Sequence, residues 1–588
     1  ATVTSSGGPV TVHGTGGSGS NSSNFGINML GYSTISSGGY GQVTVVGIGG
    51  IGSGSGNVGI SIRDPNSKIS SSGGKVQING FGGSGIGNNY GVGIASGGSI
   101  SSGGSGPIIV TGTGGSGTGS GQHGICVSDS GSMITSTSGN VDVIGIAGTS
   151  SVGNSSGVTV KDSGIITSGG TGSVNVNGTG GSNPGGSNHG VLVIGANSRI
   201  ISTNGNVSVF GQGGGNNQTG TYNHGINLNN GGVIRAGGVG STTVTGTGGN
   251  GIGDTNYGIQ LTNSGSQISS NLGPVSVYGR GGNGTGSSNF GIYMGNTALL
   301  SSGGGAVTVT AEGGGATGQG NFNLGIYVHN GSKITAGGNG AVTVTGTGGS
   351  STGHYNYGVQ VSIGNAQITS NNGPVQVAGR GGSGPGNDNY GVNVSDYGII
   401  TAGGIQRVNV RGIGGLGSGA NNYGLVVAHA GGTITSSGGH IFLTGQAGGD
   451  QGSQNGNQGI RVQTGGKVIA TGSASIFANG YGGTGSGNDN YGVLIVDPTS
   501  SMSSVNGNIT IFAKGGDSFS TGNGNQGLRL HTGGQINATG TGSISAMGIG
   551  GNVPGNDNYG VLLNGTGTQI SANNGNINIK GVGLSLIH

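Results

Sequence analysis

Asp129 and Asp162 are two acidic residues whose spacing could bring their carboxylates together on a metal ion. Each lies five residues after a glycine, Gly124 or Gly157, and these glycines hold the same place in consecutive copies of a motif that recurs about every 33 residues. If consecutive copies stack, the carboxylates lie roughly 5 Å apart. Two like charges this close repel unless a cation bridges them or one is protonated, although Lys161 offsets part of the repulsion. We therefore predict a weak calcium-type site, with simple turn formation by each aspartate as the alternative.

A second acidic motif, Gly-Asn-Asp-Asn-Tyr-Gly, occurs three times and contains Asp388, Asp489 and Asp557. It superficially resembles the glycine-aspartate nonapeptides of calcium-binding secreted toxins. Those nonapeptides recur every nine residues because consecutive short turns share each ion, whereas these copies are 68 or more residues apart. We therefore interpret the three aspartates as loop residues that lead into a strand.

Histidine and cysteine offer little further chemistry. His189 and His224 hold the same place in neighbouring copies, but stacked parallel rings do not direct their nitrogens at one point, so stacking is the prediction. Cys126 is the only cysteine, which excludes an internal disulfide and a multi-cysteine metal site. Because it alternates with Ile125 and Val127, its side chain is expected to point outward. We predict no cofactor.

Composition and charge argue against two further classes of function. Polysaccharide lyases and hydrolases need several acids gathered on one face, and here twelve Asp and the single Glu312 are dispersed along the chain. A carbohydrate-active β-helix enzyme is therefore the alternative function, and the prediction is that the chain is not an enzyme. A net charge of +3 over 588 residues, with the basic residues scattered, makes nucleic acid an unfavourable partner.

All of these residues are positioned by one hexapeptide, Asn389-Tyr390-Gly391-Val392-Asn393-Val394, whose pattern returns seventeen times. We call its invariant glycine the key glycine. The key glycines are Gly26, Gly59, Gly91, Gly124, Gly157, Gly190, Gly225, Gly258, Gly291, Gly325, Gly358, Gly391, Gly424, Gly459, Gly492, Gly527 and Gly560. Aliphatic residues follow one and three places later. A spacing of 32 to 35 residues held along the whole chain is typical of a solenoid.

Two polar or aromatic columns accompany the key glycine. Asparagine lies two residues before it in fifteen copies, and Gln122 and Ser155 replace it in the other two. We predict that these asparagines form an internal ladder along the axis: Asn24, Asn57, Asn89, Asn188, Asn223, Asn256, Asn289, Asn323, Asn356, Asn389, Asn422, Asn457, Asn490, Asn525 and Asn558. The residue directly before the glycine is predicted to form a stacked column of rings: Phe25, Tyr90, His123, His189, His224, Tyr257, Phe290, Tyr357, Tyr390, Tyr423, Tyr491 and Tyr559.

The rest of each repeat completes three short strands. A buried aliphatic nine or ten residues after the key glycine, such as Ile134, marks a second strand. A pair with period two, such as Val141 and Val143, marks a third. Glycine pairs between strands supply turns, and a Gly/Ser-rich loop that we expect to protrude precedes the next hexapeptide. The fold class is therefore all-β: a right-handed parallel β-helix of about seventeen coils, rather than the disordered linker that composition alone suggests.

We predict that residues 1–583 form a single β-solenoid repeat domain, truncated at both ends. Residues 584–588 break the pattern, and we interpret them as a non-repeat tail that resembles the read-through of a sequencing adaptor. Neither a membrane span nor a signal peptide is visible in the sequence.

The seventeen repeats resemble those of bacterial surface β-solenoids, namely autotransporter passengers and filamentous-haemagglutinin-like adhesins. The likeness covers almost the whole chain but is one of pattern, with no diagnostic secretion or anchoring motif. It implies secretion, an extracellular or cell-surface location, and a role as a stalk or adhesin. Host or surface glycans or proteins are the partners it implies, with membrane association only through flanking regions.

Overall fold

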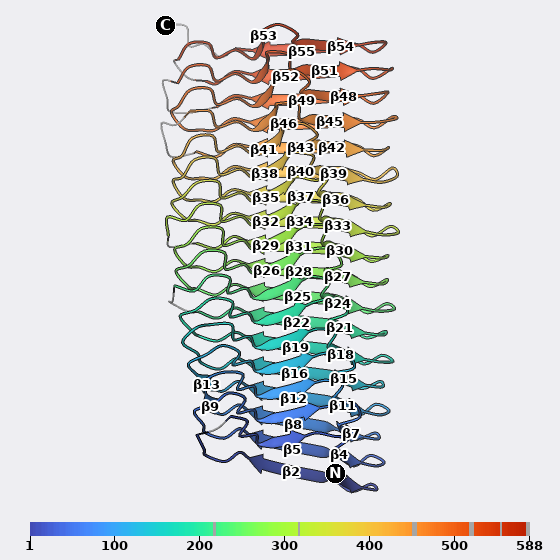
Figure 1. Cartoon of the computed structure of the whole chain (residues 1–588). Helices are drawn as coiled ribbons and strands as arrows, with labels where there is room; N and C mark the ends of the chain where they lie inside the picture. Colours follow the sequence, from blue (N-terminus) through green and yellow to red (C-terminus); the bar gives the residue numbers. More distant parts are fainter. Residues whose placement is uncertain are drawn as a thin grey trace. The chain divides into compact units, whose positions relative to one another are not determined.

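The described part of the chain folds as β-strands, turns and loops (Figure 1). The computed structural model describes residues 1–20, 22–215, 219–315, 318–449, 455–516, 522–552 and 555–583. The expected tail, residues 584–588, lies outside this described part. Within the described part no helix occurs, and hence none long and apolar enough to cross a membrane.

Each coil contains three strands, and the second coil of the chain illustrates them: Ile60–Arg63, Lys68–Ser71 and Val76–Phe81. In the third of these strands Val76 and Ile78 are fully buried, whereas Gln77 and Asn79, which alternate with them, are half-buried and face outward. This alternation is the period-two pattern of the sequence. We name the sheets first-strand, second-strand and third-strand by the order of their strands after the key glycine.

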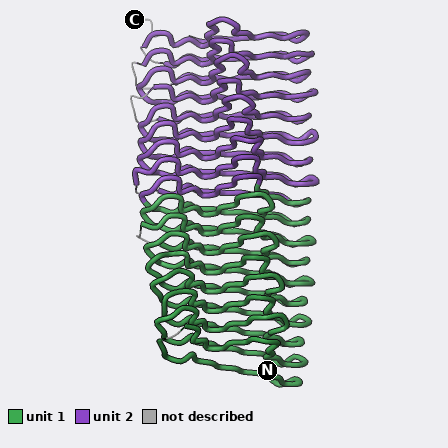
Figure 2. Tube along the Cα trace, in the orientation of Figure 1, with its two compact units in different colours: residues 1–284, 298–305 green, residues 285–297, 306–588 purple. Residues whose placement is uncertain are grey.

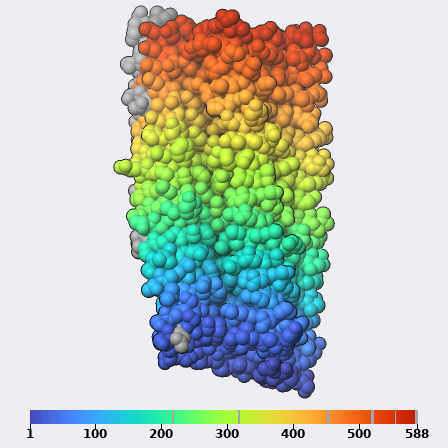
Figure 3. Space-filling model, viewed as in Figure 1, coloured from blue at the N-terminus to red at the C-terminus, as the bar shows by residue number. Residues whose placement is uncertain are grey.

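The structure divides into two compact units, and each is described by itself (Figure 2). Unit 1 contains residues 1–284 and 298–305, and unit 2 contains residues 285–297 and 306–588. In each unit the space-filling view shows side chains closing the space between successive coils (Figure 3).

Unit 1 has three parallel sheets. Its first-strand sheet contains β3 (Ile27–Met29), β6 (Ile60–Arg63), β10 (Val92–Ala95), β14 (Ile125–Ser128), β17 (Val158–Lys161), β20 (Val191–Ile194), β23 (Ile226–Asn229) and β26 (Ile259–Thr262). Its second-strand sheet contains β1 (Thr2–Ser5), β4 (Thr34–Ser37), β7 (Lys68–Ser71), β11 (Ser99–Ser102), β15 (Met133–Ser136), β18 (Ile165–Ser168), β21 (Arg199–Ser202), β24 (Val233–Ala236), β27 (Gln267–Ser270) and β30 (Leu299–Ser302). Its third-strand sheet contains β2 (Val10–Thr15), β5 (Val43–Ile48), β8 (Val76–Phe81), β12 (Ile108–Thr113), β16 (Val141–Ile146), β19 (Val174–Thr179), β22 (Val207–Gln212), β25 (Thr242–Thr247) and β28 (Val275–Arg280).

Unit 2 has the same three sheets. Its first-strand sheet contains β29 (Ile292–Gly295), β32 (Ile326–His329), β35 (Val359–Ser362), β38 (Val392–Ser395), β41 (Leu425–Ala428), β44 (Ile460–Gln463), β47 (Val493–Val496), β50 (Leu528–His531) and β53 (Val561–Asn564). Its second-strand sheet contains β33 (Lys333–Ala336), β36 (Gln367–Ser370), β39 (Ile399–Ala402), β42 (Thr433–Ser436), β45 (Lys467–Ala470), β48 (Ser501–Ser504), β51 (Gln535–Ala538) and β54 (Gln569–Ala572). Its third-strand sheet contains β31 (Val307–Glu312), β34 (Val342–Thr347), β37 (Val375–Arg380), β40 (Val408–Ile413), β43 (Ile441–Gln446), β46 (Ile476–Tyr481), β49 (Ile509–Lys514), β52 (Ile544–Ile549) and β55 (Ile577–Val582).

Within each unit, the described strands pair in parallel with their equivalents in the next coil at matching positions. In β38 and β41, for example, Val392 pairs with Leu425 and Val394 with Val427, so each buried aliphatic stacks on its counterpart. Because both residues one and three places after the key glycine are fully buried there, the aliphatic pattern forms the core. The predicted fold class, a parallel β-solenoid of about seventeen coils, is confirmed. The right-handed coil stays a prediction.

The corners of the solenoid alternate between two lengths from coil to coil. Three residues separate β10 from β11, but four separate β14 from β15. The next corner compensates, because five residues separate β11 from β12 and four separate β15 from β16. This alternation holds from β6 to β28 in unit 1 and from β32 to β55 in unit 2. The structural repeat within each unit is therefore two coils long.

Hydrogen bonds couple the short corner of one coil to the long corner of the next. The backbone N–H of Gly97, in a short corner, donates to the Ser132 hydroxyl in the following long corner at 3.0 Å. Gly231 and Ser266 repeat this contact at 3.0 Å. A small hydroxyl residue in the long corner thus satisfies a backbone donor of its neighbour.

The Gly/Ser-rich loop between coils contains short strands of its own. β9 (Ser84–Gly85) pairs in parallel with β13 (Ser116–Gly117), and isolated bridges join Gly19 to Gly52 and Ser116 to Thr149. These contacts show that the described parts of the loop stack from coil to coil, a feature that the sequence did not predict.

Candidate functional site

The key glycine is required by close backbone approach. At Gly157, an added Cβ would clash with the backbone nitrogen of Thr179 and would lie 2.6 Å from the carbonyl oxygen of Gly145. Both atoms belong to third strands that pack against this corner. Because these neighbours are backbone atoms, which cannot move without displacing a sheet, a side chain has no room here.

The asparagines two residues before the key glycines lie inside the solenoid. Thirteen of the fifteen are buried, and Asn24 and Asn558 are half-buried. The Asn356 Oδ1 accepts a hydrogen bond from the backbone N–H of Asn323, one coil earlier, at 2.8 Å. Its Nδ2 donates to the Gly353 carbonyl at 2.8 Å. Each amide therefore links the backbones of successive coils and closes the loop in its own coil.

This arrangement recurs along both units. The same bond from the preceding backbone N–H to Oδ1 is accepted by Asn57, Asn89, Asn188, Asn223, Asn256, Asn323, Asn389, Asn422, Asn457, Asn490, Asn525 and Asn558. Among the predicted residues, Asn289 donates its own N–H to Asn323 at 2.8 Å, and the Nδ2 of Asn24 donates to Asn57 at 2.9 Å. At the two exceptions, Gln122 Oε1 accepts from Asn89 and Ser155 Oγ accepts from Gln122, both at 3.3 Å. The acceptor is thus kept where the asparagine is lost.

The ring column covers the outer side of the first-strand sheet. Tyr357 stacks on Tyr390 with ring centroids 4.6 Å apart, and Tyr390 stacks on Tyr423 at 4.9 Å. In unit 1, His189 stacks on His224 at 5.1 Å, and His224 stacks on Tyr257 at 4.7 Å. The outward residues of the first strands are covered to different degrees, because Thr159 and Asn227 are buried whereas Gln260 is half-buried.

Burial under these rings keeps the imidazoles neutral. It lowers the pKa of His123 to about 4 and that of His189 to about 3, and it holds the pKa of His224 well below its usual range. The nearby Lys161 adds to the effect at His123, and His189 adds to it at His224. The contacts of His189 with His224 and of His224 with Tyr257 are ring stacks. Among the described residues no group of three or more His, Cys, Asp or Glu side chains that could hold a metal occurs.

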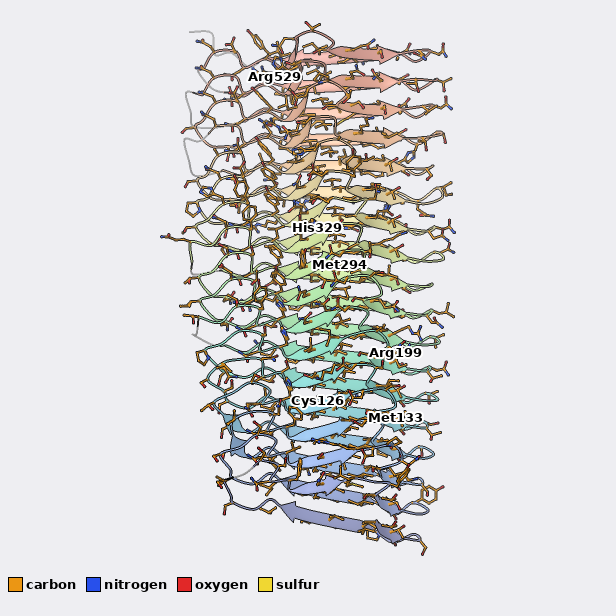
Figure 4. All side chains as sticks on the ribbon, viewed as in Figure 1. Cys126, Met133, Arg199, Met294, His329 and Arg529 are labelled. Carbon is orange, nitrogen blue, oxygen red and sulfur yellow. The ribbon has the colours of Figure 1, made fainter. Side chains whose placement is uncertain are left out.

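Cys126 shows how far this cover extends. It lies at the outward phase of β14 (Figure 4), where the sequence predicts an outward side chain. The residue is nevertheless only 3% exposed. Tyr90 and Arg63, from neighbouring coils, line the same small hollow and cover the thiol. Burial raises the pKa of the Cys126 thiol to about 11, which keeps it protonated and unreactive at neutral pH.

The predicted pair Asp129 and Asp162 follows the paired ends of β14 and β17, where Ser128 is opposite Lys161. The carboxylates have separate contacts. Asp129 Oδ2 accepts from the backbone N–H of Ser96 at 3.1 Å, whereas Asp162 Oδ2 lies 3.7 Å from Lys161 Nζ. Both residues have positive φ, as turn residues do. The calcium site stays a prediction, and calorimetry tests it: heat from calcium that disappears in Asp162→Asn supports the site, and no heat from the parent chain excludes it.

The three aspartates of the Gly-Asn-Asp-Asn-Tyr-Gly motif have one geometry. Asp388, Asp489 and Asp557 have φ between 57° and 60°. Each carboxylate accepts a hydrogen bond from the hydroxyl of the tyrosine two residues later, at 3.1, 2.6 and 2.8 Å. Their role in this structure is to form the turn and orient the ring.

An arginine–tyrosine groove in unit 2 is the feature that the sequence reasoning missed. Arg461 lies over the Tyr423 ring with its guanidinium carbon 5.1 Å from the centroid, and Arg529 lies over Tyr491 at 5.0 Å. The signal was present, because Asn-Tyr-Gly copies alternate there with Asn-Gln-Gly copies that carry arginine two residues after the glycine.

Comparison with known proteins finds no matching family model and no matching curated protein.

Proposed function

We propose that the chain is a structural or adhesive rod at an extracellular surface, the passenger or stalk region of a secreted or cell-surface protein. The buried asparagine column is the observation that carries the proposal. The Asn389 Oδ1 accepts a hydrogen bond from the backbone N–H of Asn356, one coil earlier, at 2.8 Å. Its Nδ2 donates to the Gly386 carbonyl in its own coil at 2.7 Å. These bonds add to three parallel sheets, so local opening exposes many buried polar groups at once. Resistance to opening suits a scaffold exposed to extracellular proteases.

The surface composition is consistent with this role. Charged residues make up 5% of the chain, and Gly, Ser, Thr and Asn dominate the loops. Hydroxyl and amide groups bind partners through many neutral hydrogen bonds. A surface of this kind suits contact with glycans or proteins.

The alternative is a carbohydrate-active β-helix enzyme, which requires acids gathered on one face. Within the described part, Asp388 and Asp489 bind tyrosine hydroxyls, and Asp396 pairs with His429 at 2.8 Å. These contacts orient turns and rings, and no observation favours the enzyme over the rod.

Limited proteolysis combined with a glycan and protein array tests the proposal. We expect the purified chain to resist a broad-specificity protease at the strands and to be retained on at least one class of surface ligand. Cleavage throughout the strands under native conditions would contradict a scaffold role. Shortening of an arrayed polysaccharide would favour the enzyme instead.

A further inference from the structure

Tyrosine and arginine alternate on the outer side of the first-strand sheet of unit 2, one side chain per coil. The order is Tyr423, Arg461, Tyr491 and Arg529 in four consecutive coils, and Tyr559 follows in the next. Each tyrosine directly precedes its key glycine, and each arginine follows its key glycine by two residues. The alternation has the same two-coil period as the corners. Like side chains therefore recur at twice the spacing of parallel strands, roughly 10 Å.

Each arginine packs on the tyrosine of the coil before it. Arg461 Nη1 donates to the Tyr423 hydroxyl at 3.0 Å and to Gln458 Oε1 at 2.9 Å. Arg529 Nη1 donates to the Tyr491 hydroxyl in the same way. Ring contact and hydrogen bond together hold each guanidinium in place beside its ring. The two pairs line one groove of about 350 Å³, of which Leu494 forms part of the wall.

The groove carries positive charge that the protein does not neutralise by ion pairs. In the part of the chain that the structure describes, no carboxylate lies within ion-pair distance of Arg461 or Arg529. Asp489, an acid that lines the groove, accepts from the Tyr491 hydroxyl at 2.6 Å. In addition, the Arg529 Nε is buried and has no hydrogen-bond partner among the described residues.

We propose that this groove binds an acidic glycan whose carboxylate or sulfate groups recur on every second sugar. A planar guanidinium binds carboxylate or sulfate oxygens through paired N–H donors. The two arginines are separated by about the length of one disaccharide, and an amphipathic tyrosine ring next to each offers a face on which a sugar ring packs. The inference rests on the proposed adhesive function and names the ligand class of that function.

Equilibrium binding of the full chain to three polysaccharides tests the proposal. Hyaluronan presents a carboxylate on every second sugar, chondroitin sulfate adds sulfate, and dextran is uncharged. We expect binding to one or both acidic chains and none to dextran. The difference between the two acidic arms identifies the group that the arginines recognise.

Three variants locate the binding. Arg461→Met with Arg529→Met keeps apolar packing on the rings but removes the guanidinium groups, and should weaken binding at least ten-fold with an unchanged Tm. Arg461→Lys with Arg529→Lys keeps the charge without the planar donors, and should give an intermediate loss. Arg380→Met with Arg411→Met is the matched control, because both residues are exposed at the outer side of the third-strand sheet of unit 2. It changes the net charge equally and should leave binding within two-fold of the parent.

The proposal is overturned if no acidic glycan binds, if dextran binds as well as the acidic chains, or if the control pair loses as much binding as the groove pair. If the chain is then still retained on a neutral glycan or a protein surface in the array, the adhesive function is supported but this groove is not its binding site. Absence of any retention, together with shortening of a polysaccharide, would instead remove the proposed function itself.

Discussion

Replacing Asn356 with leucine removes one rung of the asparagine column in the interior of unit 2. The side chain is fully buried, and its amide makes one hydrogen bond to each of two backbone groups, the Asn323 N–H and the Gly353 carbonyl, both at 2.8 Å. Leucine has the same branched outline but bulkier methyl groups, and it satisfies neither group. Each unpaired buried group costs about 1 to 3 kcal/mol, so the expected loss of unfolding free energy is about 2 to 6 kcal/mol.

Serine at the same position separates the two bonds. Ser155 occupies this place naturally and accepts from the preceding coil, so Asn356→Ser should keep the bond to Asn323 and lose only the bond to Gly353. The expected loss for serine is about 1 to 3 kcal/mol. Because repeat proteins unfold locally, hydrogen exchange is the assay of choice, with urea unfolding of the full chain as a second measure.

The exchange pattern distinguishes the column from simple packing. We expect the Asn323 amide to exchange faster in Asn356→Leu than in Asn356→Ser, and distant coils of unit 2 to remain protected. Equal losses in the two variants, or a leucine variant within about 0.5 kcal/mol of the parent, would refute the reasoning, since the backbone bonds would then contribute nothing measurable.

Three further predictions follow from the geometry. Gly157→Ala should destabilise unit 1 by about 3 kcal/mol or more because the new Cβ meets backbone, whereas Gly17→Ala, with nothing within 4 Å, should be neutral; urea unfolding compares them. Ser132→Ala should cost about 1 to 3 kcal/mol and speed exchange of the Gly97 amide, which loses its acceptor, and unchanged exchange would contradict this. The folded pKa of His189, about 3, lies below its unfolded value, so its contribution to stability is present above pH 6.5 and is lost as the pH falls towards 3. His189→Phe should therefore flatten the pH dependence of unfolding between pH 6 and 4, and an unchanged slope would show that the imidazole is not the titrating group.

Much of the fold could be predicted from the sequence because the repeat fixes the phase of every strand. The alternation of residues in the Gly391 hexapeptide predicts which side chains face inward. The pairing of Val392 with Leu425 follows, because each lies one residue after its key glycine. The spacing of nine or ten residues to the second strand already contained the alternating corners. The spacing did not show that the corner between the second and third strands becomes one residue longer where the corner before it is one residue shorter.

The contacts of the candidate site were harder to predict from the sequence, because they join side chains and backbone groups of different coils. The asparagine phase is visible in the sequence, but the pattern does not show that the side-chain oxygen accepts from a backbone N–H of the preceding coil rather than from a neighbouring amide. Cys126 illustrates the same limit, since its outward phase is correct for an isolated strand and its burial comes from rings of other coils. Likewise the contact between Arg461 and Tyr423 spans 38 residues and needs the stacked coils to exist.

We propose that this solenoid binds or supports at a surface and leaves its ligand chemically unchanged. Prolonged incubation of the purified chain with hyaluronan and chondroitin sulfate, followed by size analysis of the polymer and assay of new reducing ends, separates binding from turnover. We expect the chain to retain the polymer at its original length, with no new reducing ends. Progressive shortening of the polymer, abolished by replacing an acid such as Asp489, would contradict it.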